Sequence, residues 1–367
     1  MSSEPPLKQA HVDDTDNQPL KSRKYAFLIS YVGANYCGLQ IQPDVETIES
    51  KIHQAFLDSS LYHPTKPSLP ESRWSRAGRT DKGVSAAGNV LAGMFPEQED
   101  PSVFTTKLNQ HLPNDIQVIK TIRVTPSFDA RRSGTARHYE YLIPTSVLKP
   151  STATEDWTLD KDHLEKLNGL FQHFVGNNNN FFNYTAQLSP TDPKCKRDIL
   201  EISVDFLDNS EAFVLVYLHG RSFLLHQIRK MVGTVIAVFK NLIPEGYITA
   251  ALSAEVALPT PKAPGQGLLM DKVDYEYYAD SFPDVFPDDF INCKEREVFK
   301  REVLYPQMTR VITETDVFDE FIQSIDAENL CLLYDQYLQK KQVKDASVAK
   351  RKVKLTPEMI QRLKQKN

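Results

Sequence analysis

The order of strand-like and helix-like segments predicts an α+β fold built from two halves. Short stretches rich in branched and aromatic residues are typical of strands, and longer stretches with apolar residues every three or four positions are typical of helices. Between residues 24 and 275 these segments follow the order β-α-β-β-α-β twice. With 367 residues, the chain is long enough for two such units and a C-terminal helical extension.

The first half is expected at residues 24–130, after a disordered N-terminal tail at 1–23. The tail is polar, contains prolines and has no periodicity. The expected elements of this half are a strand at 25–31, a helix at 46–57, strands at 72–76 and 88–95, a helix at 103–111 and a strand at 116–124.

The second half is expected at residues 131–280 and repeats this order. Its expected elements are a strand at 137–143, a helix at 160–174, strands at 199–207 and 212–219, a helix at 222–239 and, after a proline-rich loop, a strand at 268–275. The two halves share little residue-level similarity, so the recurrence is one of topology. The extension, residues 281–367, carries helical spacing at 329–339 and a basic tail that is either a solvated helix or a flexible arm.

The composition is that of an ordinary globular chain. Hydrophobic residues make up 41% and charged residues 25%. No apolar run approaches the roughly 20 residues that span a bilayer, so no membrane partner is expected. The four cysteines lie far apart without a C-x-x-C pair, which favours reduced thiols and makes metal ligation by cysteine unexpected.

Basic residues gather in groups although the net charge is −5. The net charge argues against a uniformly basic surface, but four basic groups each adjoin a sequence motif described below, and a fifth follows residue 339. A set of this kind favours one electropositive cleft for a polyanion. The four groups are Arg73, Arg76, Arg79 and Lys82; Arg131, Arg132, Arg137 and His138; Lys194, Lys196 and Arg197; and Arg221, Arg229 and Lys230.

The stretch around Asp81 is the strongest candidate for chemistry. Asp81 lies between Arg79 and Lys82, and glycines at 78 and 83 free the backbone on either side. Nearby cations favour the ionised form of a carboxylate, and an ionised carboxylate on a tight loop suits nucleophilic or general-base work. The same residues also fit an aspartate that caps a turn beside ordinary surface cations.

Four ordered segments resemble the TruA-type tRNA pseudouridine synthases, and the surroundings of Asp81 resemble the eukaryotic, nuclear branch. The segments are RTDKGV at 79–84, RHYEY at 137–141, DPKCKR at 192–197 and SFLLHQIRKMVG at 222–233, with GQGLL following at 265–269. The resemblance runs from about Lys24 to Tyr275. It implies two halves joined edge to edge in a continuous, mostly antiparallel sheet, with helices on one side and a central RNA-binding cleft.

The resemblance also implies roles for individual residues. Asp81 would be the nucleophile, Tyr139 would lie against the target uracil, and Arg229 would pair with Asp81. Arg79 would fill the space left by the flipped uridine, and Tyr141 is expected to point to the opposite side of its strand from Tyr139. Together with the basic groups, the resemblance predicts RNA contacts by Arg76, Arg79, Lys82, Arg137, His138, Lys196, Arg197, Phe223, His226 and Lys230. No metal, nucleotide or redox cofactor is expected.

Three rival interpretations fit the sequence less well. His138 and Glu140 form the H-x-E pair of a zinc nucleobase deaminase, but the P-C-x-x-C partner is absent. A non-catalytic RNA-binding protein with two RRM-like sheets would carry the RNP1 pattern of alternating aromatics, which this sequence lacks, and would not need Asp81. A glycoside hydrolase would need a second carboxylate near the loop, and Glu71 and Asp129 are poor candidates.

The expected substrate is tRNA, with small nuclear RNA as a second candidate. The nucleus is the expected location, with cytoplasm and mitochondrion as alternatives. The sequence leaves open which uridines are modified, whether Asp81 attacks the ribose or the base, and whether the protein is a monomer or a homodimer.

Overall fold

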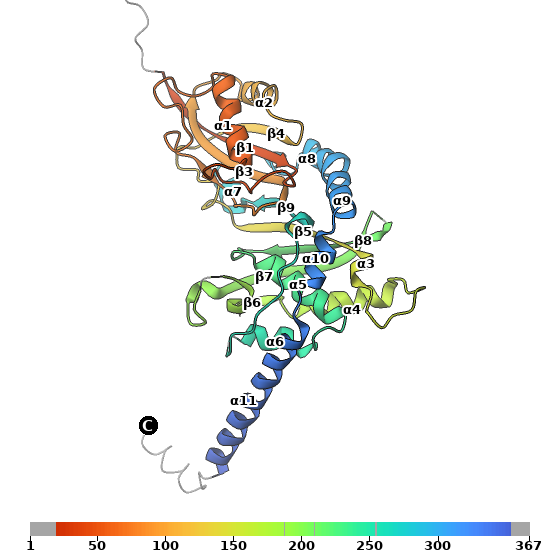
Figure 1. Cartoon of the computed structure of the whole chain (residues 1–367). Coiled ribbons are helices and arrows are strands. Elements are labelled where there is room, and N and C mark those ends of the chain that lie inside the picture. Colours follow the sequence, from red (N-terminus) through yellow and green to blue (C-terminus); the bar gives the residue numbers. More distant parts are fainter. Residues whose placement is uncertain (1–19, 187, 209, 254, 354–367) are drawn as a thin grey trace, which may run out of the picture.

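A mixed nine-stranded sheet runs through the computed structural model, which describes residues 20–353 apart from 187, 209 and 254 (Figure 1). The strand order is β4-β1-β3-β9-β5-β8-β7-β6, and β2 pairs with β3. All pairings are antiparallel except that between β3 and β9. The predicted α+β class with a mostly antiparallel sheet is confirmed.

The first elements follow the predicted order with small shifts at their ends. They are β1 (Ser22–Tyr31), α1 (Ile48–Asp58), β2 (Ser75–Arg76), β3 (Ser85–Pro96), α2 (Ser102–Asn109) and β4 (Ile116–Val124). The start of α1 illustrates a local cause. Thr47 and Ser50 form a capping box, and Ile48, Ile52 and Phe56 turn inward, where Phe56 stacks on Phe95 at 4.4 Å.

The elements from residue 136 to residue 274 include several short ones that the sequence pattern did not indicate. They are β5 (Ala136–Pro144), α3 (Thr145–Leu148), α4 (Lys161–Gln172), β6 (Gly176–Asn180), β7 (Lys196–Leu207), β8 (Ser210–Gly220), α5 (Gln227–Phe239), α6 (Gly246–Ser253) and β9 (Leu268–Asp274). Strand β6 was missed because its sequence, GNNNN, has no alternation of apolar residues.

The helix predicted at 222–239 is shorter at its start than expected. Helix α5 begins at Gln227, and the preceding residue, His226, has a left-handed backbone with φ of 64°. A left-handed residue cannot continue a right-handed helix, so residues 222–224 are irregular and residues 225 and 226 form a turn before α5. Phe223 and Leu225, which fall within the predicted range, therefore lie outside the helix.

Strand β9 joins the two parts of the sheet. Its start pairs with residues 85–86 of β3, while β2 pairs with residues 91–92 farther along the same strand. On its other side β9 pairs with β5. Leu268 and Leu269 belong to the hydrophobic core around α4 and α5, whereas Met270 and Val273 belong to the core around α1 and α2. The strand thus contributes to both cores.

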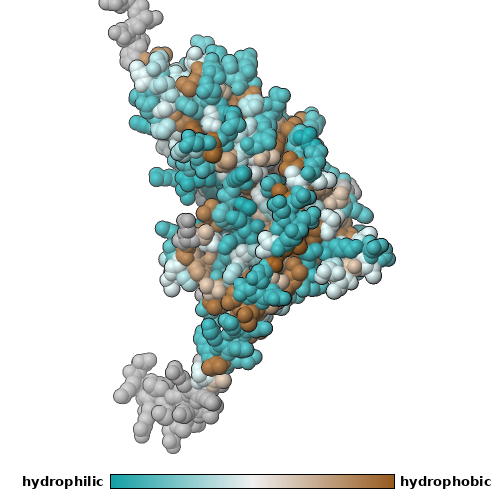
Figure 2. Space-filling model, in the orientation of Figure 1, coloured by the Kyte–Doolittle hydropathy of each residue, from teal (hydrophilic) through white to brown (hydrophobic). Residues whose placement is uncertain are grey.

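The C-terminal extension is helical and contacts both parts of the sheet. Its elements are α7 (Glu276–Ser281), α8 (Lys294–Phe299), a π-helical turn (Lys300–Leu304), α9 (Tyr305–Glu314), α10 (Val317–Gln323) and α11 (Ala327–Val353). Helices α8 and α9 lie beside β9 and β5, where the two parts of the sheet meet; we call this junction the seam (Figure 1). Helix α11 projects away from the rest of the molecule (Figure 1). The face drawn in Figure 2 is mostly hydrophilic, with hydrophobic patches mainly over the lower half of the view.

Buried charges tie the extension to the seam. Lys300 Nζ donates to Glu140 Oε1 of β5 at 3.0 Å and to Asp271 Oδ1 of β9 at 2.8 Å. Arg296 also donates to Asp271 Oδ1, at 2.8 Å, and the Tyr305 hydroxyl donates to Glu140 Oε2 at 2.8 Å. None of the helices in the described ranges is long and apolar enough to cross a membrane. The predicted tail at 1–23 falls mostly, and the end of the basic tail wholly, outside the described residues.

Candidate active site

The loop between β2 and β3 holds Asp81 in a fixed place. The Leu39 amide donates to the Thr80 carbonyl at 3.1 Å, and the Gly83 amide donates to the Tyr36 carbonyl at 3.3 Å. The Thr80 and Tyr31 hydroxyls share a hydrogen bond of 2.9 Å in the interior. Backbone and side-chain anchors therefore flank the carboxylate on both sides.

Two glycines permit the close packing of this loop. Gly38 has φ of 89°, and a Cβ there would lie 2.6 Å from the Thr80 carbonyl oxygen. A Cβ on Gly265 would lie 2.5 Å from the Lys82 carbonyl oxygen. Both distances are far below van der Waals contact, so any larger residue would displace the loop.

Asp81 forms an ion pair with Arg229, as the family resemblance implied. Arg229 Nη1 donates to Asp81 Oδ2 at 3.1 Å, and Arg229 Nε donates to the Ala263 carbonyl at 2.8 Å. The second bond fixes the guanidinium plane and leaves one edge for the carboxylate. His226 Nε2 lies 3.5 Å from the same Asp81 oxygen.

Tyr139 lies close to this ion pair. Its ring meets that of Phe223 edge to face, with centroids 5.1 Å apart and planes at 78°. Burial raises the pKa of the Tyr139 hydroxyl to about 12; Arg137 lowers this pKa and the Asp81 charge adds to the rise. At neutral pH the hydroxyl is therefore protonated.

The expectation that Tyr141 points away from Tyr139 was wrong. Strand β5 pairs regularly with β8 from Arg137 to Pro144, and side chains two residues apart in a regular strand project from the same face. The Tyr141 side chain is fully buried, and its hydroxyl donates to the Pro264 carbonyl at 2.6 Å. Tyr141 is thus a packing residue behind the site.

A cavity of about 970 Å³ opens over Asp81 and collects most of the predicted site residues. Those that line it are Asp81, Tyr139, Arg229, Arg76, Arg79, Arg137, Phe223 and His226. Arg131, Arg132 and Leu225 also line it, although none of them had been singled out as a site residue. The two arginines were recognisable from their basic group, whereas Leu225 fell inside the helix predicted at 222–239.

Besides Arg229, two of the lining arginines have internal partners. Arg76 binds both carboxylate oxygens of Glu49, at 2.7 and 3.1 Å, and Glu49 is almost fully buried. The Arg137 guanidinium donates to backbone carbonyls, including Arg131 O at 2.9 Å and Arg221 O at 3.1 Å. Arg79, by contrast, is exposed and has no side-chain partner among the described residues.

Five predicted RNA contacts do not line this cavity. Lys82 and Lys196 are exposed. Arg197 donates to the carbonyls of residues 194 and 196, and Lys230 Nζ donates to the carbonyls of residues 183 and 185 at 3.2 and 2.9 Å. Both cations thus satisfy the backbone of neighbouring turns. The fifth residue is His138.

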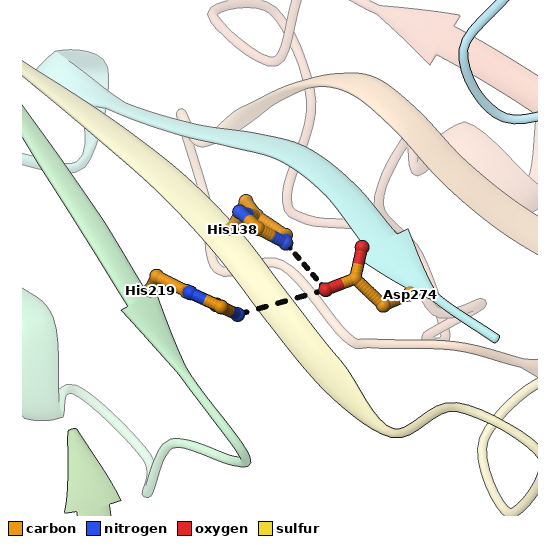
Figure 3. A group of neighbouring side chains, drawn as sticks. All are labelled: His138, His219 and Asp274. Atoms are coloured by element: carbon orange, nitrogen blue, oxygen red, sulfur yellow. Dashed lines mark hydrogen bonds and ion pairs between the residues drawn. The ribbon is translucent and has the colours of Figure 1, made fainter. Parts of the chain in front are cut away.

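His138 lies on the opposite face of β5 from Tyr139, in a cluster with His219 and Asp274 (Figure 3). The potential metal-ligand atoms of these three residues lie within 4.8 Å of one another. His138 Nε2 is 2.6 Å from Asp274 Oδ2, its Nδ1 is 2.5 Å from the Tyr217 hydroxyl, and its ring stacks on His219 at 4.0 Å. Because His138 and Asp274 already satisfy each other, we interpret the cluster as a hydrogen-bonded tie between β5, β8 and β9.

Comparison with known proteins gives the family. Residues 170–276 match the family described as "tRNA pseudouridine synthase". The mouse protein "Pseudouridylate synthase 1 homolog" is 32% identical over 331 residues, which cover 86% of this chain and 76% of the mouse protein. The human protein of that name is 33% identical over 302 residues (79% and 69%), and "tRNA pseudouridine synthase 1" of Kluyveromyces lactis is 28% identical over 413 residues (86% and 73%). The chain belongs to the TruA family of tRNA pseudouridine synthases and is of the eukaryotic type.

Proposed function

We propose that the protein isomerises specific uridines in tRNA to pseudouridine, with Asp81 as the nucleophile. The observation that carries this proposal is the Asp81–Arg229 ion pair inside a cavity lined by aromatic and basic side chains. Arg229 orients the carboxylate and leaves its second oxygen, Oδ1, free of a protein partner among the described residues. The names of the relatives, which include tRNA pseudouridine synthases, supply the substrate class.

The reaction divides into steps that the cavity residues match. The bond between ribose C1′ and uracil N1 breaks, the base turns, and a C1′–C5 bond forms while C5 loses its proton. The net change is an isomerisation without oxidation or reduction. Covalent capture by Asp81 would keep the two fragments together, and the Tyr139 ring would hold the turning base.

The proposal includes two halves, residues 24–130 and 131–280, that meet at the seam with helices covering one side. Within the first, the strand order is β4-β1-β3-β2, and within the second it is β9-β5-β8-β7. Both correspond to the order 4-1-3-2 of a split βαβ unit. Asp81 comes from the first half and Tyr139 and Arg229 from the second, so a cleft across the seam would expose all three to RNA.

Exposed cations around the cavity fit a phosphate backbone. Arg79, Arg131 and Arg132 are exposed lining residues. We assign Arg79 to the RNA stack because it lies two residues from Asp81 and its guanidinium has no partner among the described residues. The residues with internal partners, Arg76 and Arg137, would shape the cavity wall and contribute charge without moving.

Asp81→Asn tests the assignment. The change preserves shape but removes the nucleophile, so pseudouridine formation should vanish while tRNA affinity stays within a few-fold, because phosphate contacts supply most of the binding. Asp115→Asn is the matched control, since Asp115 accepts a hydrogen bond from Tyr36 outside the cavity. Substantial product from purified Asp81→Asn would refute the role of Asp81.

The nuclear location and small nuclear RNA as a second substrate complete the proposal. The basic runs at 21–24 and 350–354 support import or RNA contact. Single-nucleotide mapping of pseudouridine in nuclear and cytoplasmic RNA from cells lacking the protein would test both points together.

A further inference from the structure

Removal of the C5 proton needs a base, and the cavity offers few side chains that could serve. The titratable groups that line it, apart from the arginines, are Asp81, Asp129, Tyr139 and His226. Asp81 is the proposed nucleophile and is paired with Arg229. Asp129 Oδ1 accepts the backbone amides of the two residues that follow Ala130, at 3.0 and 2.9 Å, and so serves as a turn cap. The Tyr139 hydroxyl holds its own proton.

His226 is held in the cavity by its backbone. Its φ of 64° is in the left-handed region, which is uncommon for residues other than glycine. The turn is fixed on both sides, because the Leu224 amide donates to Gln227 Oε1 at 2.8 Å and the Thr185 hydroxyl donates to the Leu225 carbonyl at 3.0 Å. Strained backbone of this kind persists where surrounding bonds enforce it, and it gathers at functional sites.

The imidazole of His226 shares its surroundings with the nucleophile. Nε2 lies 3.5 Å from Asp81 Oδ2, and about a quarter of the side chain remains exposed toward the cavity. This distance exceeds a good hydrogen bond, and the described residues offer the ring no other partner. A group bound against Asp81 would therefore meet a free imidazole nitrogen.

Burial, together with nearby cations, keeps the imidazole of His226 neutral. Burial lowers the pKa of His226 below its ordinary 6.5, and Lys262, Arg229 and Lys230 lower it further; Asp81 acts in the opposite direction without outweighing them. These groups come from the loop before β9, from α5 and from the Asp81 loop. A neutral imidazole can accept a proton at neutral pH.

We propose that His226 is the base that accepts the C5 proton, an inference that rests on the proposed function. Once the C1′–C5 bond has formed, the C5–H bond breaks, its electron pair returns to the uracil ring and the proton passes to Nε2. The imidazolium then gives a proton to N1 or to solvent. Atoms and electrons balance without an oxidant or reductant.

The primary test follows loss of hydrogen from C5. His226→Gln keeps a polar side chain but no base, so release of tritium from tRNA labelled at uridine C5 should fall by roughly 100-fold or more. Binding of the tRNA should stay within a few-fold. His111→Gln is the matched control, because His111 is exposed and lies outside the cavity. Tritium release by His226→Gln at the wild-type rate would overturn the proposal.

Two further measurements separate base catalysis from a structural role. His226→Gly suits the left-handed backbone and leaves room for added imidazole, which should restore tritium release in proportion to its neutral fraction. Wild-type release should also fall as the pH drops below 6.5, and His226→Gln should lose this dependence. Failure of rescue together with an unchanged pH profile would overturn the proposal.

A substrate without a C5 proton distinguishes the two assignments. Transfer RNA with 5-fluorouridine at the target should be carried through glycosidic cleavage equally by wild type and His226→Gln, but not by Asp81→Asn. If His226→Gln also fails on this substrate, His226 acts before deprotonation and the inference is wrong. If Asp81→Asn succeeds, the proposed nucleophile is wrong.

Discussion

At the scale of single residues, Tyr139 could act through its ring, by stacking on a base, or through its hydroxyl, by removing a proton. Its ring contacts Phe223 and lines the cavity, while the hydroxyl, with its pKa raised to about 12 by burial, stays protonated at neutral pH. Stacking therefore fits this residue better than proton removal.

Tyr139→Phe should retain most of the activity, whereas Tyr139→Leu should lose it. Phe keeps the aromatic face, and loss of base stacking costs roughly 1–3 kcal/mol on truncation. Single-turnover rates with saturating tRNA measure the effect, and thermal melts of both variants control for unfolding. A folded but inactive Tyr139→Phe variant would show that the hydroxyl takes part in the reaction.

The sequence pointed to most of the charged residues that line the cavity but not to the partners that restrain them. Arg76 looked like a phosphate contact because it is basic and near the motif, yet it binds the buried Glu49, which lies 27 residues away in the sequence. The left-handed turn at His226 was missed for a related reason. A hydrogen bond donated by the Thr185 hydroxyl and one accepted by Gln227 Oε1 hold it, and such contacts leave no periodic signal.

At the scale of elements, the extension is fastened to the seam by charges buried behind Tyr139. Burial and the neighbouring Asp271 raise the pKa of Glu140. Asp271 has its pKa lowered, because Lys300 and Arg296 together outweigh the effect of its own burial. Lys300 thus offsets the buried negative charge of two carboxyl groups, Glu140 and Asp271, on adjacent strands.

Lys300→Met should destabilise the protein by about 3–5 kcal/mol, because it leaves buried charge without a partner. Lys120→Met is the control: Lys120 pairs with the mostly exposed Asp289, and such surface pairs are worth about 0–1 kcal/mol. Urea denaturation of both variants gives the comparison. Similar midpoints for the two would show that the buried cluster does not stabilise the seam.

The cluster in Figure 3 predicts a dependence of stability on pH. Burial and the nearby His138 lower the pKa of His219 below its ordinary 6.5, despite the opposing charge of Asp274. His219 therefore binds a proton more readily in the unfolded chain than in the folded protein. The contribution of neutral His219 to the free energy of unfolding is complete above pH 6.5 and is lost as the pH falls below it.

His219→Asn should flatten this decline. The free energy of unfolding, measured between about pH 7 and 5, should fall less steeply in the variant than in the wild type. His53 and His226 also have lowered pKa values and remain in both proteins, so the difference between the curves isolates His219. Parallel curves would contradict the assignment.

Element prediction succeeded where local pattern decides structure and failed where long-range contacts decide it. Strand β4 has the predicted bounds, because its apolar residues alternate and both ends are marked by polar turns. The position of β9 between β3 and β5 was not predicted, because nothing within residues 268–274 specifies its neighbours. Helices α7 to α10 were missed, since their short apolar faces are completed by the rest of the molecule.

At the scale of the whole molecule, positive charge gathers in two separate regions although the net charge is small. The cavity wall carries arginines from both parts of the sheet, and the far end of α11 carries Lys340, Lys341 and Lys344, all exposed. Helix α11 projects from the body, so Lys340 and Lys341 are available to a ligand larger than the cavity, whereas Lys344 pairs with Glu255 at 3.0 Å (Figure 1). A folded tRNA has that size and offers phosphates at a distance from the target uridine.

We expect the projecting part of α11 to bind phosphates of the tRNA. Replacing Lys340 and Lys341 with Gln should weaken binding and reduce the slope of log affinity against log salt by about 1 for each lost contact. Lys161→Gln with Lys166→Gln on α4 provides a control of equal charge change. Fluorescence titrations at several salt concentrations measure the slopes, and turnover at saturating tRNA should be unaffected because neither lysine lines the cavity. An unchanged slope for the α11 variant, or an equal loss in the α4 control, would show that α11 does not contact the RNA. The cations around Asp81 would then account for the binding.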